Sequence, residues 1–177
     1  MPVGWLARGL FNVVCELWKD LMLGISFFYV KSQLRSKAEI EWSTADYFRD
    51  RFEATPDRDA IVTEHETLSF RQLEERSNAV ARWVQGSTRL RQGDVCAMLM
   101  ETGPDFVAMW LGLAKVGCIA GLINTNLSHA QLGHAVGLAL KDTLGEQILV
   151  VSRNLLERVR ELQDELKGSL AFLVDTP

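Results

Sequence analysis

The chain has 177 residues, of which 47% are hydrophobic and 24% are charged, which is typical of one folded domain and excludes global disorder. Its formal net charge of −4 disfavours general affinity for nucleic acid. The cysteines, Cys15, Cys96 and Cys118, are odd in number and have no CxxC spacing. This pattern disfavours both a disulfide framework and a zinc site, and we expect Cys96 and Cys118 to be buried as small apolar residues.

Residues 1–40 form a hydrophobic and basic leader. Apolar residues recur at helical spacing from Leu6 to Phe28, and the basic residues Lys31, Arg35 and Lys37 follow. Glu16, Lys19 and Asp20 interrupt the apolar run, and charges at the bilayer centre are costly. The pattern therefore predicts an amphipathic helix that lies in a membrane surface. A membrane-spanning helix and a helix packed on the protein's own core remain alternatives, and residues 36–43 read as a linker.

The body begins with a capped helix and a hairpin. Ser43 or Thr44 can cap a helix over residues 45–55, which ends at Pro56. Residues 60–63 and 67–70 then read as two short strands around a polar turn. Ser69 opens a helix over residues 69–85, with Gly86 as a terminator.

From residue 94 onward strands and helices alternate. Strands are expected at 94–100, 118–123, 146–152 and 170–175, and helices at 105–117, 128–140 and 153–168. The repeated strand–helix units predict an α/β fold, a doubly wound, mostly parallel sheet with flanking helices and right-handed crossovers. Trp83 and Trp110 lie beside apolar residues in these helices, so we expect both in the core.

The stretch "GLAKVGCIAGLINTNL", Gly112 to Leu127, is rich in glycine but does not have the pattern of a phosphate-binding loop. Its glycines lie on or after a helix, and they do not follow G-x-G-x-x-G or Walker spacing. Gly112 is expected to let a helix approach its neighbour closely, and Gly117 to end that helix. The polar run Asn124–Asn126 follows a strand end, where ligands of α/β sheets bind, but capping the loop backbone is the favoured role.

The segments "FRQLEERSNAVARWV" and "GDVCAMLMETGPDFVAMWLGLAKVGCIAGLINTNL" are similar to the amino-terminal part of the adenylate-forming acyl-CoA synthetases. The resemblance is greatest to the branch of fatty acid transport proteins, or very-long-chain acyl-CoA synthetases, and it covers residues 44–140 well. The chain departs from that branch at Glu101-Thr102, where an acidic-Asn pair is usual, and at Ser128, where a basic residue is usual. The resemblance implies a partial AMP-binding domain over residues 41–177.

The family joins a fatty acid to coenzyme A in two steps, using ATP and Mg²⁺. Its Ser/Thr/Gly-rich phosphate loop and its catalytic lysine do not occur in residues 1–177, so no residue is assigned a catalytic, cofactor-binding or metal-ligating role. His129 and His134 are five residues apart, off a common helix face, and do not suggest a metal site.

The resemblance implies the amino-terminal part of a membrane-associated fatty acid–CoA ligase, which we expect to be inactive by itself. The alternative is a non-catalytic membrane-bound module that pairs with or regulates a full-length ligase. The expected location is the endoplasmic reticulum or plasma membrane, with the body in the cytosol. The expected partners are a membrane surface through residues 1–40, a second copy of the chain and, in the full-length family, fatty acid, ATP and coenzyme A.

Overall fold

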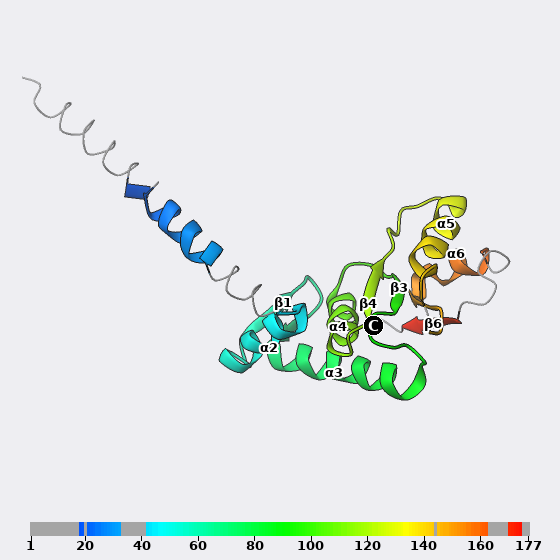
Figure 1. Cartoon of the computed structure of the whole chain (residues 1–177), viewed down its shortest axis with the longest axis horizontal. Helices are drawn as coiled ribbons and strands as arrows, with labels where there is room; N and C mark the ends of the chain where they lie inside the picture. Colours follow the sequence, from blue (N-terminus) through cyan, green and yellow to red (C-terminus); the bar gives the residue numbers. More distant parts are fainter. Residues whose placement is uncertain (1–17, 20, 33–41, 144, 163–169, 175–177) are drawn as a thin grey trace, which may run out of the picture. The chain divides into compact units, whose positions relative to one another are not determined.

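The computed structural model describes residues 18–19, 21–32, 42–143, 145–162 and 170–174 (Figure 1). The chain divides into two units, Met1–Trp42 and Ser43–Pro177. Each unit is therefore described by itself.

In the first unit, the described residues 18–19 and 21–32 are helical. The large apolar residues at 21–23, 25 and 27–30 occupy every side of this helical part, and they are exposed. The earlier part of the predicted helix, residues 6–17, lies outside the described residues. No helix in the described part of the chain is long and apolar enough to cross a membrane.

The second unit begins with the predicted capped helix and hairpin. Helix α2 (Thr44–Ala54) starts at Ser43, whose backbone N–H donates to Asp46 Oδ2 at 2.9 Å. Strands β1 (Asp59–Val62) and β2 (Thr67–Ser69) pair antiparallel. Helix α3 (Phe70–Ser87) is capped by Ser69, as predicted, but it continues one residue beyond Gly86.

The predicted α/β fold is confirmed by four parallel strands in the order β4-β3-β5-β6. These strands are β3 (Val95–Leu99), β4 (Ile119–Leu122), β5 (Ile148–Ser152) and β6 (Leu170–Val174). The connecting helices are α4 (Pro104–Lys115), α5 (His129–Leu140) and α6 (Leu156–Arg160), the last preceded by the short 3₁₀ helix η1 (Arg153–Leu155). Residues 163–168 of the last predicted helix lie outside the described residues.

Helices cover both faces of the sheet. Successive side chains of a strand point to opposite faces, and in β3 and β5 both sets are apolar, so each face packs against helices. One face packs against α3 and α4 through a cluster that includes Cys96, Met98, Ile148 and Val150. The other packs against α5 and α6 through Ala97, Leu99, Leu149, Val151 and their helical neighbours. Figure 1 shows α3 and α4 on the opposite side of β3 and β4 from α5. Both Cys96 and Cys118 are buried, as predicted.

The two glycines at helix α4 have the predicted roles. A Cβ atom at Gly112 would lie 2.5 Å from Val80 Cβ, so this glycine lets α4 approach α3 closely. Gly117 has φ +75° and follows the end of α4, in the left-handed conformation common after helices.

One prediction of burial is wrong. Trp110 is 38% exposed, and it does not lie in the core, whereas Trp83 packs partly buried against the α3–α4 side of the sheet. The strand predicted at 118–123 is present as β4, which lies at one edge of the described sheet, and its Ile119 and Leu122 are 54% and 56% exposed.

Candidate functional site

The order of the strands creates one crevice at the carboxyl edge of the sheet. The chain leaves β3 and returns through α4 to β4 on one side, whereas β5 pairs with β3 on the other side and leads on to β6. The connections after β3 and β5 thus diverge to opposite sides of the sheet. In open α/β sheets, ligands bind in the crevice outside the strand ends where this divergence occurs.

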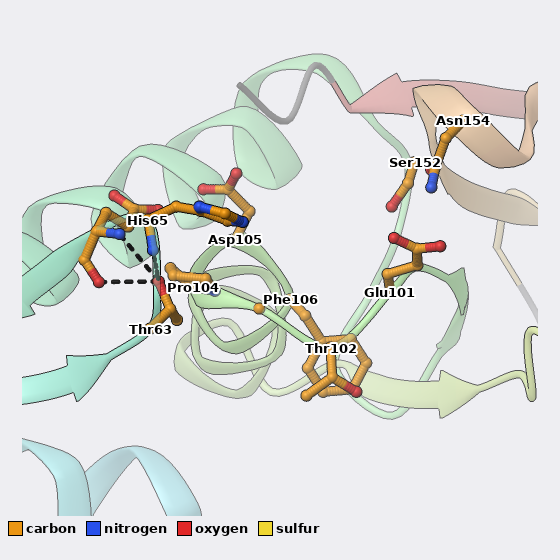
Figure 2. A pocket seen from close by; sticks show the side chains of 11 residues that line it. Thr63, His65, Glu101, Thr102, Pro104, Asp105, Phe106, Ser152 and Asn154 are labelled. Atoms are coloured by element: carbon orange, nitrogen blue, oxygen red, sulfur yellow. Dashed lines mark hydrogen bonds between the residues drawn. The ribbon is translucent and has the colours of Figure 1, made fainter.

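A pocket of about 280 Å³ lies at this place. Three segments that are far apart in the sequence line it: the turn between β1 and β2, the connection from β3 into α4, and the residues that follow β5. Figure 2 shows Ser152 and Asn154 facing Glu101 across the crevice. The lining residues are Thr63, His65, Glu66, Glu101, Thr102, Gly103, Pro104, Asp105, Phe106, Ser152 and Asn154.

Three polar side chains in the pocket are available to a ligand. Ser152 is only 2% exposed, yet it lines the pocket at the end of β5. Asn154 reaches the same space from the same side as Ser152, and Glu101 reaches it from the connection after β3 (Figure 2). Among the described residues, the Glu101 carboxylate, the Ser152 hydroxyl and the Asn154 amide have no hydrogen-bond partner. Only Ser152 is buried, whereas Glu101 and Asn154 are exposed. Buried polar groups are normally paired, so the Ser152 hydroxyl is the group for which a ligand would supply a missing partner.

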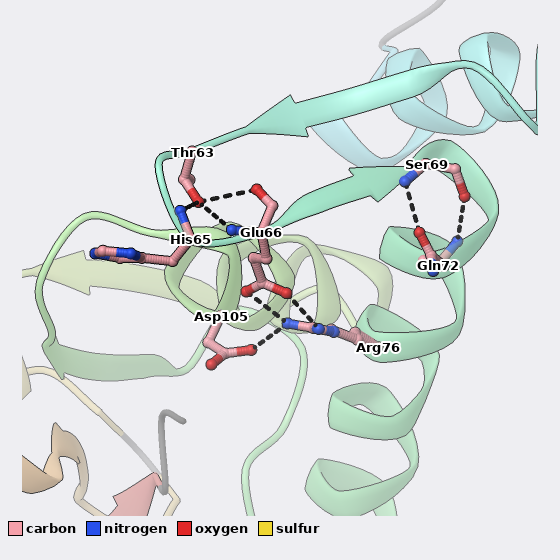
Figure 3. Close-up of polar contacts among 7 residues, drawn as sticks. All are labelled: Thr63, His65, Glu66, Ser69, Gln72, Arg76 and Asp105. Atoms are coloured by element: carbon pink, nitrogen blue, oxygen red, sulfur yellow. Dashed lines mark hydrogen bonds and ion pairs between the residues drawn. The ribbon is translucent and has the colours of Figure 1, made fainter.

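Arg76 on α3 fixes one wall of the pocket (Figure 3). Its Nη2 donates to Glu66 Oε2 at 2.8 Å, and its Nη1 donates to Glu66 Oε1 at 3.3 Å and to Asp105 Oδ1 at 3.0 Å. The hydrogen bonds to Glu66 raise the pKa of Arg76. One guanidinium therefore joins the hairpin turn to the first turn of α4 through charge-assisted hydrogen bonds to both acidic side chains.

The turn itself is held by Thr63. Its hydroxyl donates to the Glu66 carbonyl oxygen at 2.9 Å and accepts from the Glu66 backbone N–H at 3.0 Å. It also accepts from the His65 backbone N–H at 3.3 Å. These bonds leave the His65 side chain at the rim of the pocket.

A second, more open pocket of about 430 Å³ lies at the end of β4, and it shares Thr102 and Phe106 with the first. The Asn126 backbone N–H donates to Asn124 Oδ1 at 2.9 Å, which confirms the predicted structural role of Asn124 in its own loop. The Arg158 guanidinium donates to the carbonyl oxygens of Thr125 and Leu127. The loop is thus tied to α6.

The buried cysteines do not belong to the site. Burial, and to a lesser extent the neighbouring Cys118, raises the pKa of Cys96 to about 12. Burial followed by the charge of Asp94 raises the pKa of Cys118. Both are therefore protonated thiols at neutral pH, and thiols are poor nucleophiles. No group of three His, Cys, Asp or Glu side chains in the described residues could hold a metal ion.

The sequence alone did not single out Glu101, Ser152 and Asn154 as a group. Each of these residues ends or follows a predicted strand, and ligands of α/β sheets bind at strand ends, so this position was the signal in the sequence. Their proximity depends on β3 and β5 being neighbours, which local patterns do not determine. Glu101 and Ser152 are 51 positions apart in the sequence.

Comparison with known proteins agrees with the fold. Residues 48–175 match the family model described as "AMP-binding enzyme". The chain is 33% identical over 162 residues to long-chain fatty acid transport protein 1 of Bos taurus, covering 90% of this chain and 24% of that protein. It is 32% identical over 121 residues to long-chain fatty acid transport protein 6 of Mus musculus, covering 68% and 19%. The chain thus spans about a quarter or less of the curated relatives that it matches.

Solved structures share the fold at lower identity. The anthranilate CoA ligase AuaEII in complex with anthranoyl-AMP has a TM-score of 0.64 and 21% identity, over 75% of this chain and 25% of that chain. The N-terminal domain of FACL13 from Mycobacterium tuberculosis has a TM-score of 0.65 and 17% identity, over 74% and 33%.

Proposed function

Because the chain belongs to the family of AMP-binding enzymes, we propose that it is the amino-terminal part of a membrane-associated ligase that joins long-chain or very-long-chain fatty acids to coenzyme A. The observation that carries this proposal is the 33% identity to a long-chain fatty acid transport protein over 90% of the chain. A long-chain-fatty-acid–CoA ligase of Haemophilus influenzae is likewise 33% identical, over 62% of the chain.

The proposed reaction activates a carboxylate, which is a poor electrophile until one of its oxygens becomes part of a leaving group. ATP and the fatty acid give an acyl-adenylate and pyrophosphate, and the thiol of coenzyme A then displaces AMP. Mg²⁺ and cationic groups stabilise the phosphate charge in such a step. The described residues do not fit a Mg²⁺ site. The proposed role of this chain is therefore that of a scaffold. It forms the crevice at the strand ends, and Arg158 fixes the loop after β4.

A chimera tests this assignment. The matching 24% of the bovine protein would be replaced by this chain, and oleoyl-CoA formation would be measured with ATP, Mg²⁺, oleate and coenzyme A. We expect the chimera to form oleoyl-CoA, because 162 aligned residues supply the same half-sheet and flanking helices. The bovine protein, prepared in the same way, is the positive control, and a folded but inactive chimera would count against the proposal.

The chain by itself is proposed to be inactive. Residues 1–177 do not contain the Ser/Thr/Gly-rich phosphate loop of the family, and without it the phosphates of ATP are not positioned. Incubation of the purified chain with ATP, Mg²⁺ and oleate should give no more pyrophosphate than buffer does. Pyrophosphate release above that background would contradict this part of the proposal.

Membrane association is proposed through the leader. Its described part exposes large apolar side chains, including Leu23, Phe27 and Phe28, and Lys31, Arg35 and Lys37 follow in the sequence. Apolar burial and attraction of basic residues to anionic lipids act together at a bilayer surface.

Flotation with vesicles of phosphatidylcholine and phosphatidylserine tests the leader. We expect the chain to float, and Phe28→Asp to reduce the bound fraction, because a carboxylate at this position would enter the headgroup layer. Val62→Asp is the matched control, because Val62 on the hairpin is 70% exposed and Phe28 is 72% exposed. Equal loss of flotation in both variants would contradict a specific role of the leader.

A further inference from the structure

We propose that the pocket between β3 and β5 binds a primary ammonium group, held by Glu101, Ser152 and Asn154. The nearly buried Ser152 hydroxyl points into the pocket toward Glu101, and no described residue pairs with it (Figure 2). The three side chains come from two strand ends, so the sheet fixes their separation. This site is independent of the proposed ligase reaction.

The charge of the lining selects a cation. Glu66, Glu101 and Asp105 contribute three carboxylates to the pocket. Arg76 pairs with Glu66 and Asp105, so one positive charge serves two negative ones. Glu101 has no cationic partner among the described residues. The lining therefore carries a negative excess, and a positively charged ligand would be attracted to it.

The same lining disfavours an anion. The N-terminus of α4 opens at Gly103, and the first helical position is Pro104, which has no N–H to donate. Asp105 follows in the first turn, and its carboxylate offsets the positive end of the helix dipole. A phosphate or carboxylate ligand that approaches the N–H groups of this first turn would therefore meet the Asp105 carboxylate beside them.

The number of acceptors matches an ammonium group. An ammonium group has three N–H donors. The pocket offers the Glu101 carboxylate, the Ser152 hydroxyl and, once the Asn154 amide turns its oxygen inward, Asn154 Oδ1. A charge-assisted hydrogen bond to Glu101 contributes most of the affinity, because bonds to ionised partners are roughly twice as strong as neutral ones. Phe106 and Pro104 also line the pocket and provide apolar surface for the carbon atoms of the ligand.

Titration of the full chain with ethanolamine tests the proposal. The readout is the backbone amide chemical shift by ¹H–¹⁵N spectroscopy at constant ionic strength, and residues around Glu101 and Ser152 should shift in a saturable way. Glu101→Gln keeps the shape and removes the charge, so it should weaken binding at least about tenfold. Ser152→Ala should weaken it about threefold.

Two controls separate this site from general electrostatic attraction. Glu53→Gln removes an exposed carboxylate from α2 and should leave the affinity unchanged. Choline carries the same charge and hydroxyl group without N–H donors, so it should bind at least about tenfold more weakly than ethanolamine. The circular dichroism of each variant would be compared with that of the parent chain, so that a loss of binding is read only from folded protein.

Several results would overturn the proposal. These are the absence of saturable shifts with millimolar ethanolamine, equal affinity in the parent chain and Glu101→Gln, and binding of choline or Mg²⁺ as tight as that of ethanolamine. The last result would assign the pocket to cations in general. None of these readouts depends on ligase activity, so the two proposals can fail separately.

Discussion

Lys115 on α4 and Glu74 on α3 form an ion pair, with 2.7 Å between Lys115 Nζ and Glu74 Oε2. Their side chains are only 16% and 18% exposed. Lys115 Nζ also donates to Ser77 Oγ at 2.7 Å and to Asn78 Oδ1 at 2.8 Å. The ammonium group therefore makes two hydrogen bonds and one ion pair, and all three partners lie on one helix.

Lys115→Met should lower the free energy of unfolding by about 3 kcal/mol, because it leaves the Glu74 carboxylate largely buried without a countercharge. Urea denaturation checks this value. Lys141→Met, at an exposed lysine, is the control and should change it by no more than about 0.5 kcal/mol. If the double variant Lys115→Met/Glu74→Gln is no more stable than Lys115→Met alone, the explanation by an uncompensated charge is wrong.

Arg76→Met should detach the hairpin turn from α4 and lower the free energy of unfolding by about 1 kcal/mol. The expected loss is modest because the side chains of Arg76, Glu66 and Asp105 are partly exposed to solvent. Amide exchange at residues 63–66 should accelerate more than exchange in β3. Arg71→Met removes an exposed pair with Asp57 and is the matched control, for which almost no change is expected. Unchanged exchange at the turn would show that Arg76 does not hold it.

Gly112→Ala and Gly137→Ala should have opposite effects, although both glycines lie inside helices. A Cβ at position 112 would lie 2.5 Å from Val80 Cβ and 2.8 Å from the Ser77 carbonyl oxygen, so α3 and α4 would move apart at a cost of about 1–3 kcal/mol. At position 137 nothing lies within 4 Å of the new Cβ, and alanine should stabilise α5 by up to about 1 kcal/mol. Thermal unfolding measures both, and stabilisation by Gly112→Ala would refute close packing of the two helices.

The free energy of unfolding should fall with rising pH above 9, in part because of Cys96. The unfolded thiol loses its proton near its ordinary pKa of 9.0, whereas the folded thiol keeps it until about 12. Between these values the unfolded state binds fewer protons, so stability decreases by up to about 1.4 kcal/mol per pH unit. Cys96→Ala should flatten this decline in urea denaturation series between pH 8 and about 11. An equal slope in both proteins would contradict the assignment.

Local patterns were enough to predict most helices and strands of the second unit. Ser43, Ser69 and Ser128 each start a helix as predicted, and each pairs with a side chain three residues later. These signals involve neighbours in the sequence, so they can be read without knowledge of the fold. The near-continuous apolar run of β3 likewise indicated a strand covered on both faces.

Features that depend on distant segments could not be predicted. Helix α4 is apolar on nearly every side, so its sequence did not show that Trp110 would be exposed. The edge position of β4 and the pairing of β3 with β5 follow from strand order, which is determined by tertiary packing. For the same reason the group formed by Glu101, Ser152 and Asn154 was missed.

The strand order also bears on how the sheet can assemble during synthesis. β3 is the first of the four strands to leave the ribosome, and β4 and β5 pair with its two free sides in turn. β6 then adds to the outer side of β5. No strand has to insert between two that are already paired, so the nascent half-sheet can grow outward from β3 as each segment emerges.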